Sequence, residues 1–236
     1  MEHTVGVVGD DAVADRLQNA GVAVETGDET VPTTDRVVAV GEAAMTAVAR
    51  AEADPLVVPV DAGRGVRSVP RGAVADALAS LGEARVESHP VLAVEAPDGA
   101  VDRAFWDVTL VTADAARISE FAIDSAADHL GQFRADGVVV ATAAGSPGYA
   151  HRVGGPILAP AAQAVVAPIA PFATDPDHWV LPIDDIGVTV ARDEATVELL
   201  LDDRPSRIVA CDEGVAISTA PPVRVAVVAQ SRSRFG

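Results

Sequence analysis

The stretch "DGVVVATAAGSPGYAHRVGGPI", residues 136–157, begins as a strand and continues as a loop of small residues. Three consecutive valines are typical of a strand that is buried in a sheet. Residues 143–148, which follow Thr142, are alanine, glycine, serine and proline. Their small side chains cover little of the backbone. We interpret this loop as the floor of a ligand site, where a planar molecule lies against the backbone. An ordinary glycine-rich loop has the same composition and is the alternative.

The first third of the chain alternates strand-like and helix-like segments, which indicates a parallel sheet with crossover helices. The strand patterns cover residues 4–9, 22–26, 36–41 and 55–60. The helical patterns cover residues 10–20, 42–53 and 71–82. We therefore expect a Rossmann-like, three-layer α/β domain over residues 1–85.

Beyond residue 86 the pattern changes to consecutive extended segments separated by turn residues. The predicted strands are 88–96, 104–113, 116–125, 137–142, 163–169, 178–183, 186–192, 196–202 and 206–210, with one helix at 147–153. We expect a β-rich, β-sandwich-like domain over residues 86–222. The segment 223–236 is predicted to return to the first domain through a strand at 224–230.

The charge balance limits the classes of partner. The formal net charge is -18, and all 17 basic residues are arginines. An acidic surface repels nucleic-acid backbones and anionic lipids, so neither nucleic acid nor a membrane is an expected partner. Without lysine the chain has no P-loop lysine and no Schiff-base lysine. The charged N-terminus does not have the pattern of a signal peptide, and we expect a cytoplasmic protein.

The excess of carboxylates also indicates a halophilic source with a cytosol of high ionic strength, where self-repulsion is screened. We expect the melting temperature to fall when the salt concentration is lowered, because repulsion then destabilises the compact state. Thermal melting at low and at molar salt checks this, and a melting temperature that does not change with salt would contradict it.

Several candidate metal and redox residues have simpler interpretations. The single Cys211 has no partner for an internal disulfide and is expected to be a small buried apolar residue. The five histidines lie far apart, without the spacing of metal ligands, so we expect structural or surface roles and no metal site. They are His3, His89, His129, His151 and His178.

Two further patterns have a simpler interpretation. Gly6 and Gly9 lack the spacing of a dinucleotide-binding fingerprint. The aspartate pairs 184–185 and 202–203 have the composition of catalytic carboxylates, but each falls in a predicted hairpin turn, where aspartate is common.

The segment "VVAVGEAAMTAV", residues 37–48, places a glycine and a carboxylate where a buried strand meets a helix. Gly41 allows a close approach of the backbone, and the amides at a helix start attract phosphate. Glu42 beside such a site is suited to remove a proton from a hydroxyl nucleophile. The alternative is an acid that stabilises the helix start through the macrodipole.

Taken together, these segments resemble the NAD kinase family over nearly the whole chain. The family motif A-R-[MI]-x-E-F corresponds to "AARISEF" at 115–121, and A-D-G-[LV]-[IV]-[VI]-[SA]-T-P-T-G-S-T-A-Y corresponds to the segment 135–149. G-G-P-I recurs at 154–157. Weaker counterparts of G-G-D-G-T, N-x-G-x-L-G-F-L and N-[DE]-V are "VGEAA" at 40–44, "DAGRGVRS" at 61–68 and "WDV" at 106–108.

The resemblance implies an NAD kinase-like fold and transfer of a phosphoryl group from ATP, or polyphosphate, to the 2′-hydroxyl of NAD. It implies that Glu42 is the base and that ATP binds with Mg2+. The donor-phosphate loop would comprise Gly41, Ala43 and Ala44. The NAD-binding residues would be Asp61, Gly63, Asp107, Thr142, Gly145, Ser146 and Tyr149. Phosphate-binding arginines are expected among Arg64, Arg67 and Arg117, and family likeness suggests a homodimer or homotetramer.

The sequence departs from the family pattern at the phosphate loop, where Val40, Ala43 and Ala44 replace two glycines and a threonine. Trp106 also replaces the asparagine beside Asp107. These changes motivate the alternative of a catalytically silent homologue that binds NAD(P) or another nucleotide as a sensor or partner subunit. A lipid kinase of the same layout is a third reading, and the lack of a basic patch counts against it.

Overall fold

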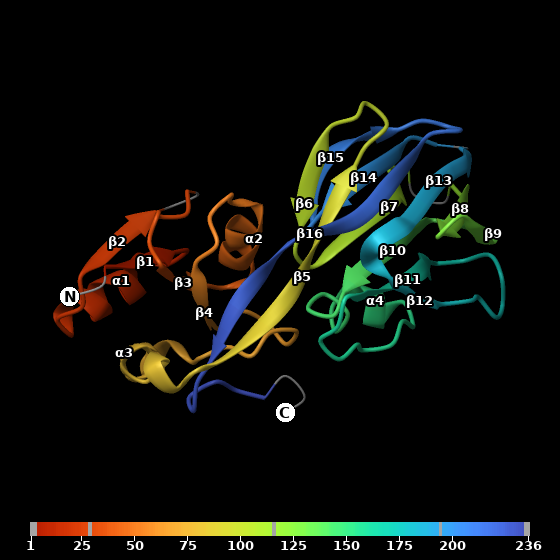
Figure 1. Cartoon of the computed structure of the whole chain (residues 1–236). Coiled ribbons are helices and arrows are strands. Elements are labelled where there is room, and N and C mark those ends of the chain that lie inside the picture. Colours follow the sequence, from red (N-terminus) through yellow and green to blue (C-terminus); the bar gives the residue numbers. More distant parts are fainter. Residues whose placement is uncertain (1–3, 28–29, 115–116, 194, 234–236) are drawn as a thin grey trace. The chain divides into compact units, whose positions relative to one another are not determined.

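The computed structural model describes residues 4–27, 30–114, 117–193 and 195–233. The chain divides into two compact units, which we call unit 1 (Met1–His89 and Pro222–Gly236) and unit 2 (Pro90–Pro221). Two strands, β5 (Arg85–Glu95) and β16 (Gly214–Val227), contribute residues to both units (Figure 1). No helix in the described segments combines the length and the apolar character that a bilayer span requires.

Unit 1 contains a parallel sheet in the order β2-β1-β3-β4, extended by the C-terminal part of β16. Its strands are β1 (Val5–Val8), β2 (Val24–Gly27), β3 (Arg36–Val40) and β4 (Leu56–Val60). Its helices are α1 (Asp11–Asn19), α2 (Glu42–Arg50) and α3 (Val74–Ala79), the last flanked by 3-10 turns at Arg71–Ala73 and Leu81–Glu83.

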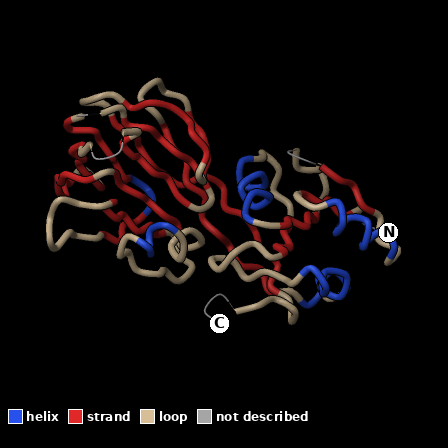
Figure 2. Tube along the Cα trace, turned by 180° about the vertical axis from the view of Figure 1, so that it is seen from behind, coloured by secondary structure: helices blue, strands red, loops and turns tan. Residues whose placement is uncertain are grey.

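The three layers of unit 1 follow from the alternation of side chains along its strands. One apolar cluster joins Val5 and Val7 of β1 to Leu17 of α1 and Val74 of α3. The buried residues of α2 are outside this cluster, and α2 lies on the opposite side of the strands from α1 and α3 (Figures 1 and 2). The expected three-layer α/β arrangement is therefore confirmed.

Unit 2 is a β-sandwich. One sheet has six strands in the order β12-β11-β10-β7-β14-β15, and the second contains β5, β6, β8, β9, β13 and the first part of β16. The largest apolar cluster takes residues from both sheets, for example Val138 of β10 and Ile123 of β8, so the two sheets share one core. The expected β-rich fold is confirmed.

The remaining elements of unit 2 have the following bounds. They are β6 (Val101–Ala104), β7 (Asp107–Thr112), β8 (Ser119–Ser125), β9 (Asp128–Ala135), β10 (Gly137–Thr142), α4 (Tyr149–Arg152), β11 (Gln163–Ile169), β12 (Trp179–Pro182), a 3-10 turn (Ile183–Asp185), β13 (Ile186–Arg192), β14 (Val197–Leu201) and β15 (Arg204–Val209).

Three elements differ from the sequence prediction. The predicted strand 104–113 is interrupted at Phe105 and Trp106, which separate β6 from β7. β9 was missed because it lies at a sheet edge, and most of its side chains are exposed or half-buried, so no apolar pattern marks it. β16 begins ten residues earlier than the predicted strand 224–230 and includes Pro221 and Pro222, residues that are uncommon inside strands. Residue 116, the predicted start of β8, lies outside the described residues.

Candidate functional site

The turn between β3 and α2 requires a glycine. Gly41 has φ 84° and ψ 173°, a conformation that is strained for other residues. Its N–H donates to the Val60 carbonyl at 2.9 Å, and no side chain caps the helix that follows. Glu42 and Ala43 are exposed in the first turn of this helix, while Ala44 is buried. The helix start therefore presents a carboxylate and amide groups to solvent.

Glu42 lies directly against the loop that follows β4. A Cβ atom built on Gly63 would collide with the Glu42 carboxylate oxygen Oε1. Gly63 also has φ +73°, so both the backbone conformation and the space favour glycine here. The structure thus brings together two of the residues named from the sequence, although Glu42 and Gly63 are 21 positions apart.

Asp61, at the start of the same loop, is held by two arginines. Its Oδ2 lies 3.8 Å from Nη1 of Arg71, and its Oδ1 lies 3.6 Å from Nη1 of Arg232. Arg71 is also 3.2 Å from the Asp10 carboxylate through Nε. Both arginines are more than half exposed, so these pairs contribute little to stability and leave the guanidinium groups able to bind a ligand.

A pocket of about 310 Å3 opens in unit 1 beside these groups. We call it the arginine pocket; its lining is Asp61, Gly63, Arg64, Val66, Ser68, Arg232 and Ser233. Arg232 was missed from the sequence because about 160 residues separate it from the loop. Of the arginines that were expected to bind phosphate, Arg64 lines the pocket, whereas Arg117 belongs to unit 2.

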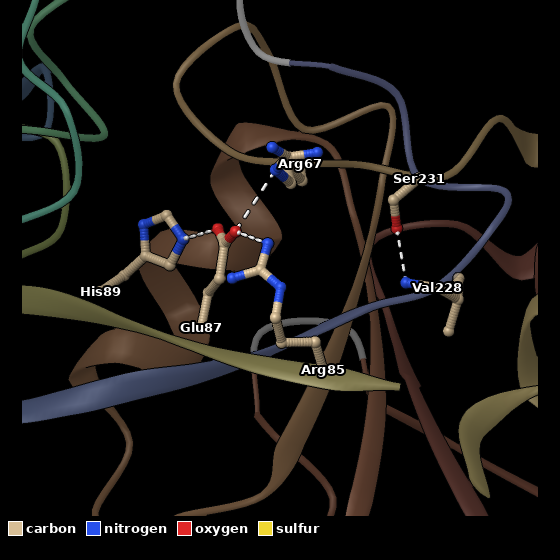
Figure 3. A network of polar contacts seen from close by, with 6 residues as sticks. All are labelled: Arg67, Arg85, Glu87, His89, Val228 and Ser231. Atoms are coloured by element: carbon tan, nitrogen blue, oxygen red, sulfur yellow. Dashed lines mark hydrogen bonds and ion pairs between the residues drawn. The ribbon is translucent and has the colours of Figure 1, made fainter. Parts of the chain in front are cut away.

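Arg67, the third expected arginine, anchors the loop instead. Its Nε lies 3.2 Å from Oε1 of Glu87 on β5, and Glu87 also pairs with Arg85 (Figure 3). Oε2 of Glu87 is 3.7 Å from Nε2 of His89, whose side chain is completely buried. Arg85, Glu87 and His89 share one face of the strand because they alternate along it. The loop 61–68 is thereby tied to β5.

In unit 2, the small-residue loop after β10 packs against the segment 105–107. A Cβ atom on Gly145 would strike the backbone of Trp106, and residues 142–146 are all buried. Thr142 Oγ1 donates to the Phe105 carbonyl at 2.8 Å. At Gly145 the small residue allows two backbone segments to approach each other. Binding of a planar ligand along this loop stays a prediction.

Ser146 stabilises the same loop. Its hydroxyl donates to the Ala143 carbonyl at 3.1 Å and accepts from the Leu158 amide at 2.9 Å. Tyr149, the first residue of α4, is 37% exposed and is the accessible side chain of this segment. The hydroxyl of Ser146 therefore positions the loop.

Asp202 holds the segment 105–107 from the other side. Its carboxylate accepts hydrogen bonds from the backbone amides of Phe105 at 3.0 Å, Trp106 at 2.7 Å and Asp107 at 3.2 Å. Asp107 is itself buried, and its Oδ1 lies 3.4 Å from Oγ1 of Thr109. The pair 202–203 does form the turn between β14 and β15, as expected, and Asp202 also serves as a backbone cap that the sequence did not indicate.

The histidines take structural or surface roles where the structure describes them. His151 Nδ1 lies 3.1 Å from the Gly155 carbonyl, and His178 Nε2 lies 3.2 Å from the Val153 carbonyl. His129 pairs with Asp124 at the surface, and His3 lies outside the described residues. Across the described residues, no three histidine, cysteine or carboxylate side chains gather as a metal site would require.

Cys211 was expected to be buried, and this was wrong. The residue is exposed, with Sγ 3.7 Å from the Ala191 carbonyl. It lies in the turn between β15 and β16.

A family model, the ATP-NAD kinase C-terminal domain, matches residues 107–229, more than half of the chain. A curated relative, the NAD kinase of Gemmatimonas aurantiaca, is 36% identical over 100 residues, which is 42% of this chain. The aligned part spans only 34% of that relative's length.

Two solved structures share the fold. A yeast NADH kinase complexed with NADH has a TM-score of 0.80 at 16% identity, covering 97% of this chain and 84% of its own. An NAD kinase from Archaeoglobus fulgidus in complex with ATP has a TM-score of 0.77 at 22% identity, covering 98% and 95%. At these identities the likeness establishes the fold.

Proposed function

The chain belongs to the family of the ATP-NAD kinase C-terminal domain, and from this membership we propose that it is an NAD kinase. The reaction transfers the terminal phosphoryl group of ATP to the 2′-hydroxyl of NAD and gives NADP and ADP. The relatives named above are an NAD kinase and NAD(H) kinases, which supports the same reaction here. A cytoplasmic location and a homo-oligomeric state stay predictions from the sequence.

The observation that carries the proposal is the contact between Glu42 and Gly63. It puts the only carboxylate of the β3–α2 turn beside the loop that lines the arginine pocket. Glu42 accepts the proton of the 2′-hydroxyl, whose oxygen then bonds to the terminal phosphorus as the bond to ADP breaks. Gly41 and the first turn of α2 supply backbone amides for the donor phosphates.

We assign the binding of NAD to residues of unit 2. Asp107, held in place through the Asp202 cap on its segment, accepts hydrogen bonds from ribose hydroxyls. Tyr149 provides the exposed aromatic contact. Thr142, Gly145 and Ser146 act as positioning residues, because their groups hold the loop and the segment 105–107 together.

We propose that Mg2+ binds together with the phosphoryl donor, as MgATP. Mg2+ takes most of its ligands from phosphates and water in nucleotide complexes, and it needs few protein side chains. The bound ion neutralises charge that develops on the transferring phosphoryl group.

The test is an assay of the purified full chain in molar salt with NAD and MgATP, followed by a dehydrogenase that accepts only NADP. We expect NADP to form with saturation in both substrates. Calorimetric binding of NAD without turnover would overturn the proposal in favour of the silent homologue that the altered phosphate loop suggested.

A Gly63→Ala variant tests whether the contact between Gly63 and Glu42 affects activity apart from any effect on stability. The added Cβ displaces the Glu42 carboxylate, so we expect kcat to fall by at least about tenfold, since small displacements of a catalytic group cost up to about a hundredfold. Gly21→Ala is the matched control, because Gly21 also has positive φ (+84°) but nothing lies within 4 Å of its Cβ. Both variants should lose similar stability, and only Gly63→Ala should lose activity. Equal kcat values in the two variants would contradict the proposal that the contact with Gly63 positions the Glu42 carboxylate.

A further inference from the structure

Glu87, near the start of β5, connects that strand to the loop 61–68. Its Oε1 lies 3.2 Å from Nε of Arg67 and also pairs with Arg85, and its Oε2 lies 3.7 Å from Nε2 of His89 (Figure 3). Both oxygens therefore face a nitrogen-bearing side chain, which fixes the orientation of the carboxylate. Of these three partners only Arg67 belongs to the loop, and all four residues belong to unit 1.

The ion pair between Arg67 and Glu87 is partly shielded from water. The Glu87 side chain is 10% exposed and that of Arg67 is 34% exposed, whereas Arg85 is 62% exposed. Water and salt screen a partly buried ion pair much less than an exposed one. We therefore expect the pair with Arg67 to persist at molar salt, where exposed pairs are screened.

Main-chain hydrogen bonds fix the two ends of the same loop. At the base, the Asp61 amide donates to the Val69 carbonyl at 3.1 Å. At the C-terminal end, the Ser68 carbonyl accepts from the Arg232 amide at 2.9 Å. Arg67 lies beside this end and adds a side-chain attachment to β5. The second half of the loop is therefore held from the main chain and from a side chain.

The first half of the loop contacts the proposed base. A Cβ atom on Gly63 would collide with Oε1 of Glu42, so the loop backbone and this carboxylate are already in close contact. Gly63 is four positions from Arg67, and between them the chain includes the buried Val66. Ala62, on the other side of Gly63, is also buried. Because close-packed segments transmit displacements, a shift at Arg67 moves Gly63 as well.

We propose that Glu87 is a positioning residue for the phosphoryl transfer. Through Arg67 it holds the loop 61–68, and through Gly63 the loop holds the Glu42 carboxylate in place. The part of Glu87 in the reaction rests on the proposed function, whereas the attachment of the loop to β5 does not. No bond forms or breaks at Glu87, which acts only through the loop.

Arg67→Ala and Arg85→Ala form a matched pair, because each removes one guanidinium partner of the same Glu87 oxygen. Only Arg67→Ala releases the loop. We expect it to lower kcat for NADP formation by about tenfold, since a displacement of about 1 Å costs up to about a hundredfold. Arg85→Ala should stay within about twofold of wild type. Melting curves at the assay salt concentration check that both variants are folded.

A double variant separates positioning from a general loss of stability. In Gly63→Ala the contact between the loop and Glu42 is already disturbed. Adding Arg67→Ala should therefore lower kcat by less than about twofold further, whereas two independent effects would multiply. Full multiplication of the two effects would overturn the proposal, and so would equal kcat values in Arg67→Ala and Arg85→Ala.

Limited digestion with trypsin tests the attachment of the loop without any turnover. Arg64 is exposed in the loop, and cleavage after it requires the loop to open locally. We expect this cleavage, followed by mass spectrometry, to be about tenfold faster in Arg67→Ala than in wild type and unchanged in Arg85→Ala. Unchanged cleavage in Arg67→Ala would overturn the proposal. Faster cleavage in a protein that forms no NADP would support the attachment and reject only the proposed function.

Discussion

Glu42→Gln is expected to lower kcat for NADP formation by about a hundred- to ten-thousand-fold, the range in which a general base contributes to rate. The amide keeps the length and shape of the side chain but does not accept the proton of the 2′-hydroxyl. Because Glu42 is exposed at a helix start, the fold should survive the change. Initial rates at saturating NAD and MgATP, together with a melting curve, measure both effects.

Glu52→Gln is the matched control for this variant. Glu52 is an exposed glutamate two residues beyond the C-terminal end of α2, and the same change there removes the same charge from unit 1. Its kcat should stay within about twofold of wild type. A Glu42→Gln enzyme as active as Glu52→Gln would show that proton removal falls to another group.

Asp202→Ala is expected to lower the free energy of unfolding by about 2–4 kcal/mol more than its neighbour Asp203→Ala, because unsatisfied buried donors cost about 1–3 kcal/mol each. Three amides of residues 105–107 lose their common acceptor, and Phe105 and Asp107 are buried. The loss should also raise KM for NAD, since Asp107 is held through this cap. Denaturant titration and NAD-dependent rates give the two values.

The comparison with Asp203 isolates the cap. Both aspartates lie in the turn between β14 and β15 with positive φ, 50° and 62°. Substitution by alanine therefore raises the conformational free energy of the backbone by a similar amount at each position. Asp203 is exposed, and no hydrogen bond of its side chain is found among the described residues. Equal stability of the two variants would mean that the three amides find water or other acceptors at no cost.

The strands of this protein were predictable where they are buried. Valine runs such as residues 138–140 and 37–38 mark core strands, because a buried strand needs apolar side chains on both faces. The exposed edge strand β9 lacks that requirement and carried no signal. The length of β16 was hidden by its two prolines, since a strand accommodates proline only where no ladder hydrogen bond is required.

Only the site residues that belong to short sequence motifs could be predicted. Glu42 and Gly63 each belong to a short recognisable segment, and the structure brings them together. Arg232 and Asp202 act on segments 160 and 95 positions or more away, and nothing in their local sequence indicates those contacts. Composition does not distinguish space for a ligand from space for another backbone, so the contact of Gly145 with the Trp106 backbone could not be predicted from the sequence.

The most direct test of the proposed function is the identity of the product. Phosphorus NMR of the purified wild-type chain with NAD and MgATP should show a 2′-phosphate monoester signal that grows in step with ADP. That result is predicted because the proposed base removes a proton from the ribose 2′-hydroxyl and from no other group. Formation of ADP without this signal, or no change in the spectrum while NAD remains bound, would contradict the proposal.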